Sequence, residues 1–353
     1  MTDSPPAAGA AATAADLRGK EEEVRSLVRQ FAGQRLPGER DLAARLQISR
    51  PRLRAILATL RREGLVEQRQ GSGTFAVAPA GSAGGVGRLR RAALLVDENL
   101  KLGDDPFFSL LLELLQRQLQ QEGVRCVVER VTGEETAPHF EEGALTLGLA
   151  GAALLARHRG GTNAPPLVTL FPEPDARPHR RASLLGVDDR EAGREAARAL
   201  IRRGCGSLLF LGKEEIPASR ERLAGAREAA EAEGVSLRFL PSGLSHGAGL
   251  RTGRSLALDA DGTTGLIATN DWLAVGLRAG LADRHGARAA TVPLVSFDGL
   301  PLAADPGLHI RSLTLPVEAI AADAVAELLR LHASPVSVGR AVRYPFAWRS
   351  DAL

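Results

Sequence analysis

Three arginines at alternate positions could bind a nucleic acid. Arg50, Arg52 and Arg54 begin a segment whose apolar residues recur at helical spacing, which predicts a helix over residues 50–63. Because Arg50 and Arg54 are four residues apart, their side chains project from the same face of that helix. A guanidinium group matches the O6 and N7 acceptors that guanine presents in the major groove of DNA. The pattern therefore predicts a helix that reads a duplex.

A G-x-S-x-G sequence could carry a different chemistry. Gly243–Gly247 follows a predicted strand and precedes a predicted helix, which is the context in which Ser245 would act as the nucleophile of a hydrolase. His285, His309 and His332 are candidate bases. The motif is short and the chain contains 38 glycines, so chance matches are expected. A hydrolase stays an alternative, and the chain is predicted not to be an enzyme.

The arginine-bearing helix belongs to a small N-terminal module. Two further helices and the two strands of a hairpin are expected over residues 16–31, 39–46, 65–70 and 74–77. Ser49 is placed to cap the arginine-bearing helix, whose first turn tolerates Pro51. Gly71 and Gly73 supply the tight turn between the strands. Three helices followed by a hairpin predict a winged helix-turn-helix.

Positive charge is concentrated in the same module. Residues 16–80 contain 13 Lys and Arg against 8 Asp and Glu, although the whole chain carries a net charge of only +3. A basic module attached to a nearly neutral remainder indicates a polyanion as the partner of the module. We therefore expect a disordered tail, a DNA-binding domain, a linker and a larger domain, at residues 1–15, 16–78, 79–89 and 90–353.

Three sequence blocks of the module resemble the motifs of the GntR family of transcription factors. They occur in the family's order and spacing, at Leu36–Ala43, Ile48–Arg54 and Gly71–Phe75. The resemblance implies contacts with double-stranded DNA from Arg40, Ser49, Arg50, Arg52, Arg54, Gly71, Gly73 and Thr74. Gly38 stands where the family has a helix-capping serine, and Arg52 stands where it has a threonine. The change at Arg52 is expected to alter which bases are read. The alternative is a solvated arginine-rich face on a winged helix that binds protein.

Beyond residue 90, short apolar strands alternate with amphipathic helices. Strands are expected over 92–96, 124–129, 152–155, 167–171, 184–187, 207–211, 236–240, 265–268 and 292–297. The alternation predicts an α/β fold with parallel sheets covered by helices on both faces. Because these strands are too many for one sheet, we expect two lobes, the second starting near residue 184. A ligand cleft is expected at the carboxyl ends of the strands.

Four blocks in this region resemble the effector-binding domain of the LacI/GalR family of repressors, which is related to periplasmic binding proteins. They are Val187–Gly193, Ser219–Gly225, Ala268–Ala274 and Val295–Gly299. The resemblance implies a periplasmic-binding-protein-like domain in which Arg222, Asn270 and Asp298 hold ligand hydroxyl groups. It also implies that Phe107 and Phe108 supply apolar contacts. Donors and acceptors mixed in this way suit a polyol.

The blocks depart from the family's pattern at three positions. Asp189 stands in place of an asparagine, Gly299 replaces a second aspartate, and Leu244 lies where an aromatic side chain often stacks on the ligand. Either the ligand is unusual or it binds weakly. Structural roles are the alternative. Asn270 and Asp298 could cap helices and turns, and Phe107 and Phe108 could be core residues.

The two resemblances together imply a ligand-responsive transcription regulator, expected to be a repressor, in an arrangement similar to that of arabinose-responsive repressors. We expect a homodimer, since one winged helix covers only half of a palindromic operator, and a carbohydrate as the small-molecule effector. A binding protein without DNA function is a further alternative.

Other features of the sequence concern compartment and cofactors. The chain has no apolar run long enough to cross a membrane, no secretory signal and only two cysteines, Cys126 and Cys205. These features indicate a cytoplasmic protein. The sequence shows no nucleotide-binding or metal-binding motif, so no cofactor is expected.

Overall fold

The computed structural model divides into two compact units, residues 1–88 and 89–353. It describes residues 20, 23–24, 27–28, 31, 36–62, 65–69, 73–76, 88–100, 102, 105–132, 142–147, 154–155, 158, 165–258, 263–334 and 336–349. Each unit has a buried apolar core of its own. None of the described helices is long and apolar enough to cross a membrane.

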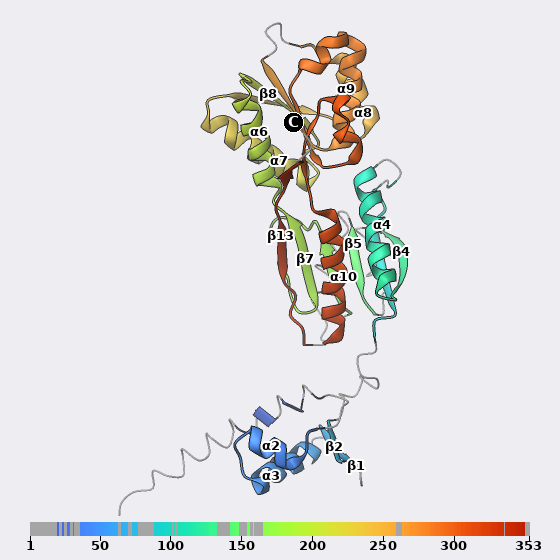
Figure 1. The fold of residues 1–353 in the computed structure, drawn as a ribbon, viewed down its shortest axis with the longest axis vertical. Coiled ribbons are helices and arrows are strands. Elements are labelled where there is room, and N and C mark those ends of the chain that lie inside the picture. Colours follow the sequence, from blue (N-terminus) through green and yellow to red (C-terminus); the bar gives the residue numbers. More distant parts are fainter. Residues whose placement is uncertain are drawn as a thin grey trace, which may run out of the picture. The chain divides into compact units, whose positions relative to one another are not determined.

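The first unit contains the predicted helix-turn-helix and hairpin (Figure 1). Its elements are α2 (Glu39–Arg45), α3 (Arg50–Arg62), β1 (Val66–Arg69) and β2 (Gly73–Ala76), with the two strands antiparallel. As predicted, Ser49 caps α3, because its Oγ accepts a hydrogen bond from Arg52 N at 3.4 Å. The backbone carbonyl of Ser49 accepts a second bond, from Leu53 N at 3.0 Å.

Leucines at helical spacing hold this unit together. Leu42 of α2 and Leu53 and Leu60 of α3 are buried against one another, and Val66 of β1 closes the core. Burying one such side chain contributes about 1.5–3 kcal/mol. Residues 23–24 and 27–28 are also helical, while the rest of the helix predicted over 16–31, except residues 20 and 31, lies outside the described residues, as do the predicted tail and most of the predicted linker.

The second unit contains two lobes, each built on a six-stranded sheet. The strands of the first lobe are all parallel and lie in the order β13-β7-β6-β5-β3-β4. Their bounds are β3 (Arg91–Asp97), β4 (Arg125–Val131), β5 (Ala144–Leu147), β6 (Leu167–Leu170), β7 (Ala182–Val187) and β13 (Ala341–Tyr344). β5 and β6 are buried along their whole length and β3 is buried at every residue but its first, as expected for a parallel sheet that is covered on both faces.

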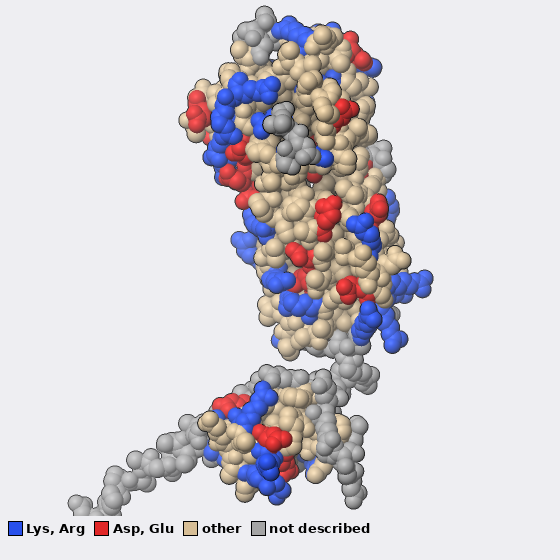
Figure 2. All heavy atoms as spheres, in the orientation of Figure 1, with Lys and Arg blue, Asp and Glu red and all other residues tan. Residues whose placement is uncertain are grey.

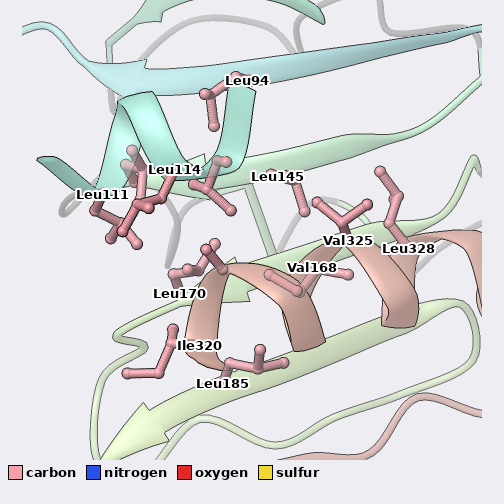
Figure 3. Close-up of a cluster of buried hydrophobic side chains, with 14 of the residues drawn as sticks. Leu94, Leu111, Leu114, Leu145, Val168, Leu170, Leu185, Ile320, Val325 and Leu328 are labelled. Carbon is pink, nitrogen blue, oxygen red and sulfur yellow. The ribbon is translucent and has the colours of Figure 1, made fainter. Parts of the chain in front are cut away.

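Two helices cover one face of the first sheet, α4 (Pro106–Gln121) and α10 (Val317–Ala333). Leu111 of α4, Val168 of β6 and Ile320 of α10 meet in the core between helices and sheet (Figure 3). Helix α10 therefore completes a core in which β3 to β7 precede it by more than 100 residues.

The prediction of a strand over residues 152–155 is wrong. Residues 154–155 are helical, and the strand that fills this place in the sheet is β5, at residues 144–147. Both segments are short apolar runs. The period of hydrophobic residues cannot separate a buried strand from a buried helix over so few residues.

The second lobe has the strand order β14-β12-β11-β10-β8-β9. Its strands are β8 (Ser207–Gly212), β9 (Ser236–Pro241), β10 (Thr264–Ala268), β11 (Leu294–Asp298), β12 (Arg311–Thr314) and β14 (Ala347–Trp348), all parallel except β14. Helices α6 (Asp189–Arg202) and α7 (Pro217–Ala232) lie on one side of the sheet, and α8 (His246–Ser255) and α9 (Asp271–His285) on the other (Figure 1). The 3-10 helices are η2 (Gly286–Thr291), η3 (Pro301–Ala304) and η4 (Pro306–Leu308).

Two glycines allow α6 and α7 to lie unusually close together. A Cβ atom on Gly193 would be 1.9 Å from Arg222 O, and one on Gly225 would be 1.8 Å from Arg190 O. Charged side chains of both signs lie over these helices (Figure 2), and Arg190 and Glu228 pair across them. Exposed ion pairs contribute little, so the absence of side chains at the two glycines sets the approach.

The chain crosses between the lobes three times, after β7, after β12 and after β13. The predicted α/β fold with two parallel-sheet lobes is confirmed. The predicted start of the second lobe near residue 184 needs correction, because β7 is buried inside the first sheet between β6 and β13. The crossing follows Val187, where the strand ends and α6 begins.

Candidate DNA interface and ligand site

The predicted reading helix presents its arginines unevenly. Arg50 and Arg54 are exposed on α3 and Arg40 is exposed in the first turn of α2, whereas Arg52 is half-buried. Lys and Arg side chains stand on the visible face of this unit (Figure 2). An exposed guanidinium group can reach a phosphate or a guanine edge. Arg40, Arg50 and Arg54 are therefore better placed for DNA than Arg52.

Arg54 is held in place by an ion pair within the unit. Its Nε lies 2.7 Å from Glu39 Oε2 in the first turn of α2, and its side chain is still 63% exposed. The pair orients the guanidinium group without covering it. Less side-chain entropy is then lost when the group binds a partner.

The hairpin carries the remaining predicted DNA contacts. Thr74 is half-buried in β2, and its carbonyl accepts a hydrogen bond from Leu36 N at 2.8 Å, which ties the hairpin to the segment before α2. Gly73 is the first residue of β2 and pairs with Arg69. Gly71 lies outside the described residues. Ser49 is exposed, although its hydroxyl already caps α3.

In the second lobe, a buried arginine contacts several of the polar residues. Arg222 of α7 is only 6% exposed. Its Nε donates to Asp189 Oδ1 at 2.7 Å, and its Nη1 donates to Thr269 O at 2.5 Å and lies 3.5 Å from Asp298 Oδ1. The guanidinium group also stacks over the ring of Phe297, 4.6 Å from its centroid. The structure thus brings together two of the three polar residues predicted from the sequence, and adds Asp189.

The elements of the lobe fix this arrangement from several directions. Asp189 begins α6 directly after the crossing from the first lobe, Arg222 lies in α7, and Asp298 ends β11. The backbone of Asp298 has a φ of 104°, in the left-handed region. Such a conformation costs about 1–3 kcal/mol in a residue other than glycine. Strain of this kind is concentrated at binding sites because the surrounding fold imposes it.

Burial dominates the electrostatics of the cluster. It raises the pKa of Asp298 well above its ordinary value, and Arg222 opposes that shift. The pKa of Asp189 is raised by burial in the same way. Burial works against the charge of Arg222, yet the two carboxylates together raise its pKa. One guanidinium group is therefore shared between two carboxyl groups, which leaves them with capacity to accept hydrogen bonds from a ligand.

Asn270 has the capping role that the sequence left open. Its Oδ1 accepts a hydrogen bond from Leu273 N at 2.9 Å at the start of α9. The amide nitrogen of Asn270 forms no hydrogen bond within the described part of the chain, so it remains available as a donor. The neighbouring Asp271 is buried, and its carboxylate accepts bonds from Ser296 Oγ and from Leu300 N.

Phe107 and Phe108 open α4 in the first lobe. Phe107 is 7% exposed within the apolar core, which favours core packing as its role, while Phe108 is half-buried. Phe171 joins them, with ring centroids 5.8 Å from Phe107 and 6.1 Å from Phe108. Asp105 caps the helix, and its charge contributes to the raised pKa of Asp298. This start of α4 therefore lies near the Arg222 cluster.

A cavity of about 100 Å³ opens beside the crossing from β7 to α6. Leu184 and Val342 of the first lobe and Pro217 of the second form part of its walls. None of the three polar residues predicted to bind a ligand lines it. Asp189 lines the cavity and also binds Arg222, so the two places adjoin. The polar cluster is the better candidate, because its buried donors and acceptors supply directional contacts.

The sequence analysis did not assign Asp189 or Phe171 to the ligand site. Asp189 counted only as a departure from a family pattern, although its position at the end of a strand could have marked it. Phe171 gave no signal, since it reads as the last residue of an apolar strand.

Ser245 has a structural role. Its Oγ accepts a hydrogen bond from Ala248 N at 3.3 Å and so caps α8. The predicted candidate bases lie elsewhere: His285 Nε2 is 2.8 Å from Leu256 O, and His332 Nδ1 is 3.1 Å from Glu142 O in the first lobe. Within the described ranges no histidine ring hydrogen-bonds to Ser245. The geometry gives no support to a nucleophile at this position.

Comparisons with solved structures agree with this architecture. A LacI family transcriptional regulator from Enterococcus faecium with bound ribose is 19% identical, with a TM-score of 0.61 over 74% of this chain and 97% of that chain. The Escherichia coli transcriptional repressor ascG is also 19% identical, with a TM-score of 0.59 over 75% and 99%. The transcriptional regulator CelR in complex with cellobiose reaches 0.60 at 19% identity, over 89% and 98%. At identities this low, the structural likeness establishes the fold and nothing further.

Sequence comparisons identify the two parts of the chain. Residues 23–76 match the model of bacterial regulatory proteins of the gntR family, and residues 197–348 match that of the periplasmic binding protein-like domain. No curated protein matches the chain. The chain therefore joins a regulatory domain of the gntR family to a periplasmic binding protein-like domain.

Proposed function

We propose that the protein is a transcription regulator whose affinity for DNA responds to a small polar ligand, a sugar or sugar derivative. The observation that carries the proposal is the buried cluster of Arg222, Asp189 and Asp298 in a chain that also bears a gntR-type domain. That domain argues against the alternative of a binding protein without DNA function.

The chemistry of the cluster supports a ligand with several hydroxyl groups. Asp189 and Asp298 accept hydrogen bonds, Arg222 donates them, and the amide of Asn270 can donate one more. The rings of Phe108 and Phe171 offer apolar surface at the start of α4. The relatives solved with ribose and with cellobiose add support for a carbohydrate.

The DNA partner follows from the size of the winged helix. One α3 helix reads one half-site, so a homodimer on a palindromic operator would place two such helices in successive major grooves. A ligand that binds one conformation of the lobes more tightly than the other favours that conformation. The resulting change in affinity for the operator can be no larger than the difference between the ligand's affinities for the two conformations. We propose action as a repressor in the cytoplasm, where the operator is accessible.

A thermal-shift screen of the full chain against pentoses, hexoses, disaccharides, uronates and polyols tests the ligand class. A ligand at 100 times its Kd stabilises its domain by about 2.7 kcal/mol. Asp298→Ala is expected to remove the shift. Asp305→Ala is the matched control, because among the described residues the Asp305 side chain accepts a hydrogen bond from Gly307 N, at the start of η4 in the same lobe.

The same preparation tests the DNA partner. Selection from a random duplex pool yields the operator, and the identified ligand is then added to the complex. A change in operator affinity of about 5- to 150-fold corresponds to the usual coupling between two sites. The proposal fails if Asp298→Ala and Asp305→Ala respond alike to every sugar, or if the ligand leaves operator affinity unchanged.

A further inference from the structure

The cavity beside the crossing from β7 to α6 has walls from both lobes. The first lobe supplies β7, β13 and the segment after β6, and the second supplies the starts of α6 and α7. Glu173 in the first of these walls forms an ion pair with Arg220 of α7, at 3.3 Å, and so links the lobes. A volume of about 100 Å³ has room for several water molecules, which is enough for a small metabolite.

Much of the cavity wall is apolar and rigid. Proline rings, which fix the local backbone, and aliphatic side chains line it, at Pro172, Pro174, Pro217, Leu184 and Val342. Gly186 of β7 leaves space in this wall, because a Cβ atom there would approach no atom beyond the adjacent residues closer than 3.7 Å. The apolar part of an occupant can therefore lie against a surface that is already formed.

Carboxylates line the cavity where α6 and α7 begin. Asp188 Oδ1 accepts a hydrogen bond from Glu191 N at 3.2 Å, and Glu221 Oε2 lies 3.5 Å from Arg190 Nη1. A carboxylate has about four acceptor sites, so both keep capacity for a further donor. Burial raises the pKa of Asp189, and the charges of Asp188 and Glu221 act on it in the same direction. Negative charge is therefore concentrated on this side of the cavity, where it favours a cationic group.

Arg343 supplies positive charge from the first lobe. It is exposed, and it lies beside Gly186 in the parallel register of β13 and β7. Its Nη2 donates to Pro174 O at 3.4 Å, which is a long bond. A guanidinium group has five N–H donors, and two of them can bind one carboxylate together. Arg190 also lines the cavity, but it is paired with Glu228. Arg343 is therefore the cation better placed to bind an anionic group.

We propose that this cavity is a second ligand site, which binds an α-amino acid with an aliphatic side chain. Asp188 and Glu221 bind its ammonium group, Arg343 binds its carboxylate, and its side chain lies against the prolines. A neutral sugar would not use these opposite charges, and a simple amine would use only one of them. Because the walls belong to both lobes, the occupant stabilises the arrangement of the lobes described here. The site requires neither a sugar nor DNA, so it is independent of the proposed function.

Titration calorimetry of the full chain with L-leucine, without sugar or DNA, tests the site. Isoamylamine and 4-methylvalerate have the same branched chain but lack the carboxylate and the ammonium group, respectively. Each is expected to bind at least about tenfold more weakly than L-leucine, because hydrogen bonds between charged groups are lost.

A variant that fills the cavity tests the place of binding. Gly186→Val is expected to abolish binding of L-leucine. Gly206→Val is the matched control, because a Cβ atom on Gly206 meets no atom closer than 3.8 Å and the residue lies outside the cavity. Gly186→Ala adds a methyl group with ordinary contacts only, and its weaker but measurable loss of affinity tests the site even if the valine variant does not fold.

Two further variants test the charged walls. Glu221→Gln and Arg343→Met are each expected to weaken binding of L-leucine about tenfold. Glu228→Gln is the control for the first, since Glu228 also pairs with Arg190 but does not line the cavity. Arg238→Met is the control for the second, since Arg238 is exposed on β9 and lies outside the cavity.

Three results would overturn the proposal. The first is that L-leucine does not bind, and the second is that Gly186→Val and Gly206→Val bind it equally. The third is that Asp298→Ala removes binding of L-leucine while Gly186→Val retains it, because the amino acid would then occupy the Arg222 cluster.

Discussion

The close contact between α6 and α7 predicts the effect of a single added methyl group. In Gly225→Ala the new Cβ would lie 1.8 Å from Arg190 O, whereas such contacts are essentially never shorter than 3.0 Å. The helices must therefore separate locally by about 1.2 Å, because the packed interior offers no other room. Overpacking of this kind costs about 1–3 kcal/mol.

The same separation acts on the polar cluster. Arg222 Nε and Asp189 Oδ1 are 2.7 Å apart and lie on the two helices that must separate. An added 1.2 Å would take the pair to about 3.9 Å, beyond the range of a hydrogen bond. We expect Gly225→Ala to lower the melting temperature by about 3–10 °C. It should also weaken binding of any ligand that uses Arg222.

Scanning calorimetry of the full chain measures the first effect and titration calorimetry the second. Gly247→Ala in α8 is the matched control, because the nearest atom to its new Cβ is Arg251 Nη1 at 3.5 Å. This variant is expected to be neutral or more stable, by up to about 1 kcal/mol. A Gly225→Ala protein that melts no lower than Gly247→Ala would refute the argument that helix contact positions Arg222.

Three further changes test other parts of the molecule. Arg50→Ala combined with Arg54→Ala should abolish selective binding of the operator in a gel-shift assay while the ligand-induced thermal shift persists. Ser245→Ala should cost about 1 kcal/mol, the usual value of a helix cap, in chemical denaturation; no cost would contradict the capping role. Burial raises the pKa of Asp271 to about 6, so the stability that its protonated form contributes is lost as pH rises from about 4 through 6. Asp271→Asn should flatten the melting temperature over that window, and an unchanged slope would show that other groups cause it.

Much of the architecture could be predicted because it is local in origin. The helical spacing of Leu53 and Leu60, the cap at Ser49 and the glycines of the hairpin define the winged helix within about 40 residues. The alternation of strands and helices, which predicts parallel sheets, is also a local signal, because strands and helices differ in the spacing of their hydrophobic residues.

The candidate site was harder to predict because it depends on contacts between distant segments. Arg222 and Asp298 are 76 residues apart and meet only when α7 packs against the end of β11. The role of Asp189 follows from the approach of α6 and α7 at Gly193 and Gly225, which no residue pattern encodes. Residues 154–155 were assigned to a strand because a run of four apolar residues has no measurable period.

The return of the chain to the first lobe determines the order in which the protein can be completed. Residues 317–344 supply the last helix and an edge strand of a sheet that begins at residue 91. On a ribosome, the part of β3 that α10 covers must wait until more than 200 further residues have been made, with α4 alone on that face in the meantime. The second lobe, nearly continuous in sequence, can fold in that interval. The sheet of the first lobe therefore closes after most of the second lobe has been made, and a chaperone that shields apolar surface would act on it.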